Sequence, residues 1–333
     1  MLKQNLILLI FIVISTACST SQSSPTDLAE QYQVGDSYMR IKLQGTIELA
    51  YQKINGIRLT ELSGLAWDDD EQLLYAISDQ GYLFHLQPFF VKNVLVAVNP
   101  VSAYSLRNKR GKRLPSLDAE GLAILKNNNG RTGDTELLIS FERRPQIARF
   151  RVDGQKLNDY TLPTKLQKIN NYYNSNKMLE SVTRHPRFGI LTAPEWPLKF
   201  KQKTYSLKGQ HQHTLFALKG NMKWTFPAYS APNSAIVALE TLNDESILIL
   251  ERAFVSFYRP LIISLRQLWL FKNGTTTHQQ IAVFDSRQGW YIDNFEGLTH
   301  HQGPYFFIVS DDNDSSFQTT LLSYWELVPV KNK

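Results

Sequence analysis

The sequence contains a single cysteine, Cys18, among its 333 residues, so an intramolecular disulfide is excluded. Positive charge is in only slight excess: 36 Lys plus Arg against 30 Asp plus Glu leave a net charge of +6. Charge spread this thinly argues against a nucleic-acid-binding protein. The absence of a Gly-x-Ser-x-Gly motif argues against a Ser-His-Asp hydrolase. No segment has a long helical period, which disfavours an α/β barrel.

A short apolar run marks the N-terminus, where Lys3 precedes the stretch from Leu6 to Ile14 and small residues lead to Cys18. This pattern predicts an export signal over residues 1–17, too short for a membrane-spanning helix. Cys18 resembles the lipid-accepting cysteine of bacterial lipoproteins, although Ser15 replaces the usual aliphatic residue; plain secretion is the alternative. We expect a lipid anchor on Cys18, a flexible tether over residues 18–30, and attachment to the outer membrane on its periplasmic side.

A repeated four-residue pattern dominates the rest of the chain: an apolar residue, an acid, a small residue, then Leu or Val. With 43% hydrophobic residues the chain can bury a large core. The central positions of the pattern lie 57, 60, 60 and 56 residues apart, as expected for a repeat architecture. They are Ser63, Glu120, Glu180, Glu240 and Glu296, of which Ser63 departs from the pattern.

Each repeat reads as four short strands, because an apolar run that ends in an acid follows each central position and two more strand-like runs follow in most repeats. Four strands per repeat predict an all-β fold, a β-propeller formed by residues 31–333 as one domain. Five blades are favoured, with six as the alternative. The last repeat supplies about three strands, so we expect a strand within residues 38–51 to complete the last blade and close the ring.

Acidic side chains are predicted to gather at one mouth of the central channel, because the first strand of each blade lines the axis. Glu120, Glu180, Glu240 and Glu296 would form a ring, with Glu61 in place of Ser63. The second strands end at the same mouth. Their terminal acids are Asp79, Glu142, Glu195, Glu251 and Asp311.

Carboxylates so close together need a compensating positive charge. An oxygen-only set of ligands suits Ca²⁺, which accepts six to eight irregular ligands, and these acids are the predicted metal ligands. Arg143, Arg144 and Arg252 directly follow second-strand acids and offer another source of compensation. The alternative is that the acids form salt bridges and strand-end hydrogen bonds between blades.

The Glu-Gly-Leu units and the closing Asn294-Phe295-Glu296-Gly297-Leu298, followed by Ile308-Val309-Ser310-Asp311-Asp312-Asn313, resemble the phytase-like family, described as having esterase-like activity of phytase. The similarity covers about residues 55–328. It implies an exported or lipid-anchored bacterial β-propeller with a link to calcium-dependent hydrolysis of phosphate esters.

On this basis we expect hydrolysis of a phosphoric or carboxylic ester, with Ca²⁺ on the acids and a free carboxylate or imidazole for proton transfer. Glu240, Glu296 and His300 are the candidate catalytic residues, and Arg143 and Arg252 would clamp a phosphate. The basic stretch from Lys199 to Lys208 is either a further ligand contact or a solvated loop. The alternative function is a non-catalytic propeller that binds a ligand or a cell-envelope protein at the acidic mouth.

Overall fold

The computed structural model describes residues 23–50, 52–115, 118–199, 211–256, 258–315 and 317–329. The predicted export signal, Cys18 and nearly all of the basic stretch from Lys199 to Lys208 lie outside these ranges. Within the ranges, no helix has the length and apolar character needed to cross a membrane.

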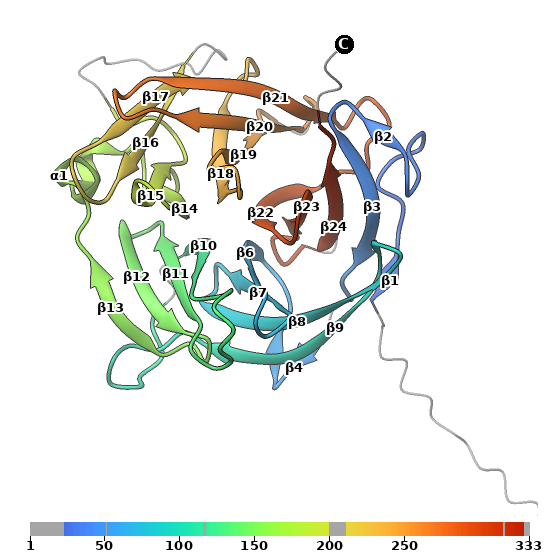
Figure 1. The fold of residues 1–333 in the computed structure, drawn as a ribbon, viewed down its shortest axis with the longest axis horizontal. Coiled ribbons are helices and arrows are strands. Elements are labelled where there is room, and N and C mark those ends of the chain that lie inside the picture. The colour runs from blue at the N-terminus through green and yellow to red at the C-terminus, as the bar shows by residue number, and fades with distance from the viewer. Residues whose placement is uncertain are drawn as a thin grey trace, which may run out of the picture.

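Five four-stranded antiparallel blades surround a central axis, which Figure 1 views end-on. The first strand of each blade is innermost and the last is outermost. The first four blades are β6 (Leu62–Asp68), β7 (Leu73–Ser78), β8 (Tyr82–Val91) and β9 (Val94–Ser105); β10 (Ala119–Leu125), β11 (Glu136–Phe141), β12 (Gln146–Arg151) and β13 (Lys156–Tyr160); β14 (Leu179–His185), β15 (Gly189–Pro194), β16 (Gln212–Ala217) and β17 (Lys223–Pro227); and β18 (Ser234–Thr241), β19 (Ile247–Ala253), β20 (Ile262–Leu270) and β21 (Thr276–Asp285).

The fifth blade joins the two ends of the chain. It consists of β22 (Asn294–His300), β23 (Tyr305–Asp311) and β24 (Leu321–Leu327), completed on the outside by β3 (Ile41–Glu48). β24 and β3 pair antiparallel, with Leu321 opposite Glu48 and Leu327 opposite Ile41. The predicted five-bladed all-β propeller, with its ring closed by an N-terminal strand, is confirmed.

Several short strands and helical turns lie outside the four-stranded blades. β1 (Ser24–Pro25) and β2 (Ser37–Tyr38) pair with β3, and β4 (Lys53–Ile54) pairs with β5 (Ile57–Arg58). The helical elements in the described ranges are α1 (Thr164–Gln167) and the 3₁₀ turn η1 (Ile169–Asn171).

The predicted tether extends too far along the chain. Leu28 and Ala29 are buried, and Ala29 forms an isolated β-bridge with Trp290. Because β1 also pairs with β3, the packed structure begins before residue 31. Apolar contacts of Leu28 and Ala29, which a polar-rich composition concealed, hold this segment against the ring.

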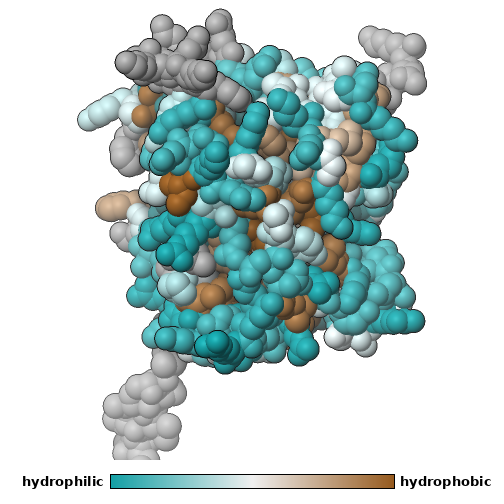
Figure 2. Space-filling model, turned by 90° about the vertical axis from the view of Figure 1, so that its left-hand side faces the viewer, coloured by the Kyte–Doolittle hydropathy of each residue, from teal (hydrophilic) through white to brown (hydrophobic). Residues whose placement is uncertain are grey.

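Apolar side chains fill the spaces between neighbouring blades. Between the first two blades, Tyr75 and Ile77 of β7 share one cluster with Ile139 of β11 and Phe150 of β12. Burying one such large side chain contributes about 1.5–3 kcal/mol. The side of the ring seen in Figure 2 is mostly hydrophilic, with hydrophobic atoms showing in patches between polar ones.

Every innermost strand has a β-bulge at the same level of the axis. The pairing of β6 with β7 skips Ser63, that of β14 with β15 skips Glu180, and that of β22 with β23 skips Glu296. The same irregularity lies between Ala119 and Leu122 in β10 and between Ile236 and Ala238 in β18. A bulge redirects the side chain of its extra residue, so this position is suited to a functional group.

The small residue after the bulge allows adjacent inner strands to approach closely. A Cβ on Gly64 would lie 2.7 Å from the carbonyl oxygen of Glu120, and one on Gly121 would lie 2.7 Å from the Cα of Ser181. Real Cβ atoms do not approach backbone atoms this closely, so glycine is required at both positions. In the recurring acid-small-Leu pattern, the acid thus lies in the bulge, the small residue allows the close strand contact, and the Leu is a core residue.

Candidate active site

Glu120, Glu180 and Glu296 meet at the end of the axis where the first strands begin. Each offers a carboxylate oxygen, and these oxygens lie within 4.8 Å of one another. The three residues come from β10, β14 and β22, and each lies in the bulge of its strand. The structure therefore brings together three of the four acids predicted to form a ring.

The acids that follow the second strands extend this cluster. Two further groups with the same 4.8 Å spacing overlap the first: Glu142, Glu180 and Glu195, and Asp118, Glu120 and Glu142. Asp79 and Asp311 each interact electrostatically with Glu296. We call this end of the axis the acidic mouth. Its members are Asp79, Asp118, Glu120, Glu142, Glu180, Glu195, Glu296 and Asp311.

Asp118 was not predicted. It lies two residues before Glu120, and the period-two alternation that was applied to Glu61 and Ser63 would have placed it on the same side of its strand. Glu61 itself precedes β6. The pKa of Asp79 is raised mainly by burial and, to a smaller extent, by the negative charge of Glu61. Glu61 therefore lies at the rim beside Asp79, while Ser63 occupies the bulge.

Burial and mutual repulsion raise the pKa of several acids of the mouth. Burial raises the pKa of Glu120 and Glu180 well above the usual value, and neighbouring carboxylates raise it further. The same causes raise the pKa of Asp79 to about 7. Such perturbed groups are typical of functional sites.

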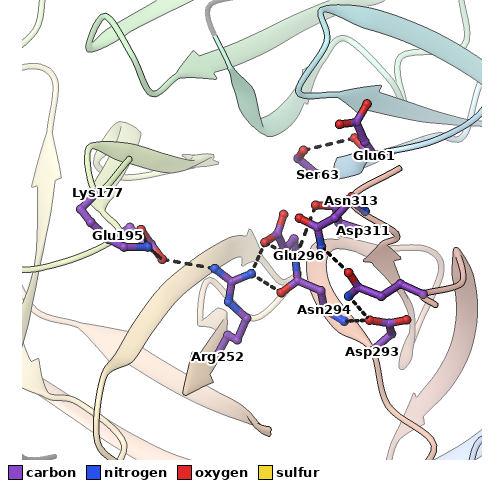
Figure 3. Close-up of polar contacts among 11 residues, drawn as sticks. Glu61, Ser63, Lys177, Glu195, Arg252, Asp293, Asn294, Glu296, Asp311 and Asn313 are labelled. Atoms are coloured by element: carbon purple, nitrogen blue, oxygen red, sulfur yellow. Dashed lines mark hydrogen bonds and ion pairs between the residues drawn. The ribbon is translucent and has the colours of Figure 1, made fainter. Parts of the chain in front are cut away.

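Two basic side chains compensate part of the negative charge. Figure 3 shows Arg252 between Glu195 on one side and Glu296 with Asn294 on the other. Its Nη2 lies 3.4 Å from Glu195 Oε1, and its Nη1 donates to Glu296 Oε1. Lys177 Nζ lies 2.6 Å from Glu195 Oε2. Burial opposes the charge of Arg252, but the carboxylates of Glu296 and Glu195 raise its pKa, so it stays protonated.

Glu120 and Glu180 form no ion pair with either base, although the Glu180 carboxylate also contributes to the raised pKa of Arg252. These two glutamates are 8% and 6% exposed. Within the part of the chain that the structure describes, their carboxylates have neither a hydrogen-bond donor nor an ion-pair partner. A buried carboxylate without a partner is costly, so these two are either protonated or bound to a cation from solution. An all-oxygen donor set fits a hard cation such as Ca²⁺.

Residues 57–314 match the protein family described as phytase-like, with esterase-like activity of phytase. The chain belongs to the phytase-like family. No curated protein matches it. The match covers the inner strands of all five blades and therefore the whole acidic mouth of this phytase-like propeller.

Glu240 does not join the acidic mouth, contrary to the prediction. The bulge of β18 skips Val237, so Val237 is the counterpart of Glu120, Glu180 and Glu296. Glu240 lies three residues further along β18, opposite Leu248 and near the other end of the axis. The prediction placed the repeat three residues too late in the fourth blade.

Glu251 is also misplaced by the prediction, here by one residue. It faces the interior between blades, where it accepts hydrogen bonds from Arg266 Nε and the Tyr229 amide and contacts His213 Nε2 at 3.0 Å. Burial alone would raise the pKa of Glu251, but His213 and Arg266 lower it. Arg252 takes the position at the mouth, because neighbouring residues on a strand point to opposite faces.

His300 lies at the far end of β22, and its amide donates to Glu240 Oε1 at 3.0 Å. Two of the three candidate catalytic residues therefore lie away from the acidic mouth, and Glu296 is the one that the mouth contains. Arg143 is exposed and forms an ion pair with Asp118 through its Nε. Arg143 is thus open to solvent at the rim while paired with Asp118, whereas Arg252 is more buried and pairs with both Glu195 and Glu296.

Proposed function

We propose that the acidic mouth is a Ca²⁺-dependent hydrolytic site for phosphoric or carboxylic esters. The observation that carries the proposal is the pair of buried carboxylates, Glu120 and Glu180, which accept no hydrogen bond and form no direct ion pair among the described residues. Family membership supports hydrolysis as the activity. The overlapping groups of acids would hold the ion, with Glu120, Glu142 and Glu180 shared between groups.

Residues around these metal-binding acids would bind the substrate, accept a proton and position the ligands. When bound, Ca²⁺ supplies positive charge to ester oxygens and lowers the pKa of a coordinated water. Arg143, exposed at the rim, binds an anionic oxygen of the substrate. Asp79 is partly exposed and so is the acid that water reaches most easily; its carboxylate accepts the proton of the attacking water. Arg252 and Lys177 fix Glu195 and Glu296 in place.

The test measures hydrolysis of phytate, an aryl phosphate and an acyl ester with Ca²⁺ and with chelator. We expect chelator-sensitive turnover that falls at least about 100-fold in Glu180→Gln, since this substitution removes a shared ligand. Glu136→Gln is the matched control, because Glu136 lies at the opposite end of β11 from Glu142 and pairs with Lys126 and Arg149 near the surface. Absence of chelator-sensitive turnover in the folded protein would refute the hydrolase.

A second function, a non-catalytic propeller that binds a ligand or an envelope protein at the same mouth, is favoured by one observation. Arg252 and Glu296, two of the residues predicted to act on a substrate, already bind each other. Calorimetric Ca²⁺ binding without turnover, together with a partner from membrane extract that Glu180→Gln no longer retains, would select this function.

We further propose that the protein is exported and lipid-anchored through Cys18 at the outer membrane, facing the periplasm. The N-terminal sequence pattern supports this location. Metabolic labelling with a radioactive fatty acid tests it: label should enter the wild type and be absent from Cys18→Ser.

A further inference from the structure

A cavity of about 650 Å³ lies at the end of the axis opposite the acidic mouth. The inner strands end here, and the cavity is lined by Trp67, Asp69, Thr183, Arg184, Glu240 and His300, among others. None of its lining residues belongs to the acidic mouth. Its volume is typical of a site for a small molecule.

The ionisable groups inside this cavity carry little free charge. Burial raises the pKa of Glu240 to about 8, so at neutral pH its carboxyl is mostly protonated and can both donate and accept. Burial lowers the pKa of His301 to about 4, so its ring is neutral. Asp69 already accepts hydrogen bonds from Trp67 Nε1 at 2.7 Å, Asn128 Nδ2 at 3.0 Å and Gln302 Nε2 at 3.1 Å.

Besides Arg184 and His300, the remaining polar lining is made of amides and hydroxyls. Asn127, Asn128, Asn243 and Gln302 line the cavity. Thr183 and Thr241 share a hydrogen bond of 2.9 Å between their hydroxyls. Glu240 Oε1 accepts from the His300 amide, which fixes one oxygen and leaves Oε2 to face other partners. The cavity thus presents neutral donors and acceptors from several blades.

We propose that this cavity binds a small uncharged polyhydroxylated molecule, a monosaccharide or disaccharide. Each hydroxyl of such a ligand both donates and accepts, which complements a wall of amides, threonines and a carboxyl group. A metal ion is disfavoured, because no group of metal-binding residues found within the described ranges includes a residue of this cavity. Arg184, the basic side chain of the lining, is exposed at the rim.

The experiment measures saturation-transfer NMR and calorimetric binding of maltose, cellobiose and N-acetylglucosamine to the full chain. We expect at least one of these neutral sugars to bind, with an affinity unchanged by chelator and by Glu180→Gln, because both act at the other end of the axis. Glu240→Gln should retain binding within about threefold, since the amide resembles a protonated carboxyl, while Glu240→Leu should lose it at least tenfold.

Thr183→Val provides a second variant that removes a lining hydroxyl, in case Glu240→Leu fails to fold; it should weaken binding about fivefold. Failure of all three sugars to bind overturns the proposal. Equal loss in Glu240→Gln and Glu240→Leu overturns it in favour of a cationic ligand. Binding of glucose 6-phosphate that exceeds that of the neutral sugars and disappears in Arg184→Met overturns it in favour of an anionic ligand.

Discussion

Arg252 shows how one residue changes the chemistry of a repeated site. In each of the other four blades, the residue before the bulge pairs with a residue of the second strand, and the residue that follows this partner is an acid. These acids are Asp79, Glu142, Glu195 and Asp311. In the fourth blade this place is taken by Arg252, and the bulge residue is the apolar Val237. The fourth blade therefore adds no carboxylate to the cluster and instead contributes a permanent cation, which pairs with Glu195 and Glu296.

Removing this cation should destabilise the metal-free protein. For Arg252→Met we expect the free energy of unfolding to fall by about 3–5 kcal/mol, because Glu195 and Glu296 lose a buried partner. Part of the loss should return with Ca²⁺, which replaces the missing charge. Urea unfolding with and without Ca²⁺ measures this. Arg184→Met, at an exposed arginine, should change stability by less than about 0.5 kcal/mol, and a similar loss in both variants would contradict the assignment.

At the scale of the strand, the sequence predicts most of the fold because every blade repeats the same physical constraints. The close contacts at Gly64 and Gly121 and the bulge acids recur with nearly constant spacing, so the number of blades can be counted. The closing strand was also predictable, since the last repeat lacked one strand.

The fourth blade was not predictable in detail. Leu239-Glu240-Thr241-Leu242 matches the repeated pattern, yet the bulge lies at Val237. Counting from Glu180 to either position gives a spacing within the range of the other repeats, so spacing could not decide. Only the pairing of Ile236 with Glu251 shows which residues face the axis. The position of Glu240 in the cavity at the other end follows from this three-residue shift and had no sequence signal.

The contact of inner strands at the bulge can be tested at Gly121. Gly121→Ala should reduce the free energy of unfolding by about 1–3 kcal/mol, because the new methyl group would meet the Ser181 Cα at 2.7 Å. Ser181→Ala is the control on the facing strand: its buried hydroxyl has no hydrogen-bond partner among the described residues, so its loss should be nearly neutral. Thermal unfolding compares the two. Equal stability of Gly121→Ala and wild type would show that the strands can separate.

At the scale of the whole molecule, the acids make stability depend on pH. Burial and repulsion raise the pKa of Asp79 to about 7 and that of Glu142 to about 8. Unfolded carboxyl groups titrate near pH 4, so the folded state binds more protons at neutral pH, and stability is lost as pH rises through the folded pKa values.

We therefore expect the Tm of the metal-free protein to fall between about pH 7 and pH 9, a range in which the histidines whose pKa is lowered are already neutral. Saturating Ca²⁺ should flatten this decline by compensating the ionised carboxylates. Calorimetry in chelator and in Ca²⁺ provides both curves. A Tm that rises with pH in chelator would contradict the assigned pKa shifts.

Closure of the ring is the other property of the whole molecule. A variant without residues 1–49 lacks β3, which leaves β24 with an open edge, and we expect it to lose cooperative unfolding in urea. A variant without residues 1–22 keeps β1 and β3 and should unfold like the full chain. Cooperative unfolding of the shorter variant would mean that the ring does not depend on this strand.

The pairing of β3 with β24 also affects biosynthesis. A ribosome completes β3 before any strand of the first four blades, whereas β24 emerges after all of them have been made. The nascent polypeptide must therefore carry a hydrogen-bonding edge without its partner while four complete blades are synthesised. Such an edge is prone to associate with other chains, so the cell has to shield it until the last blade arrives.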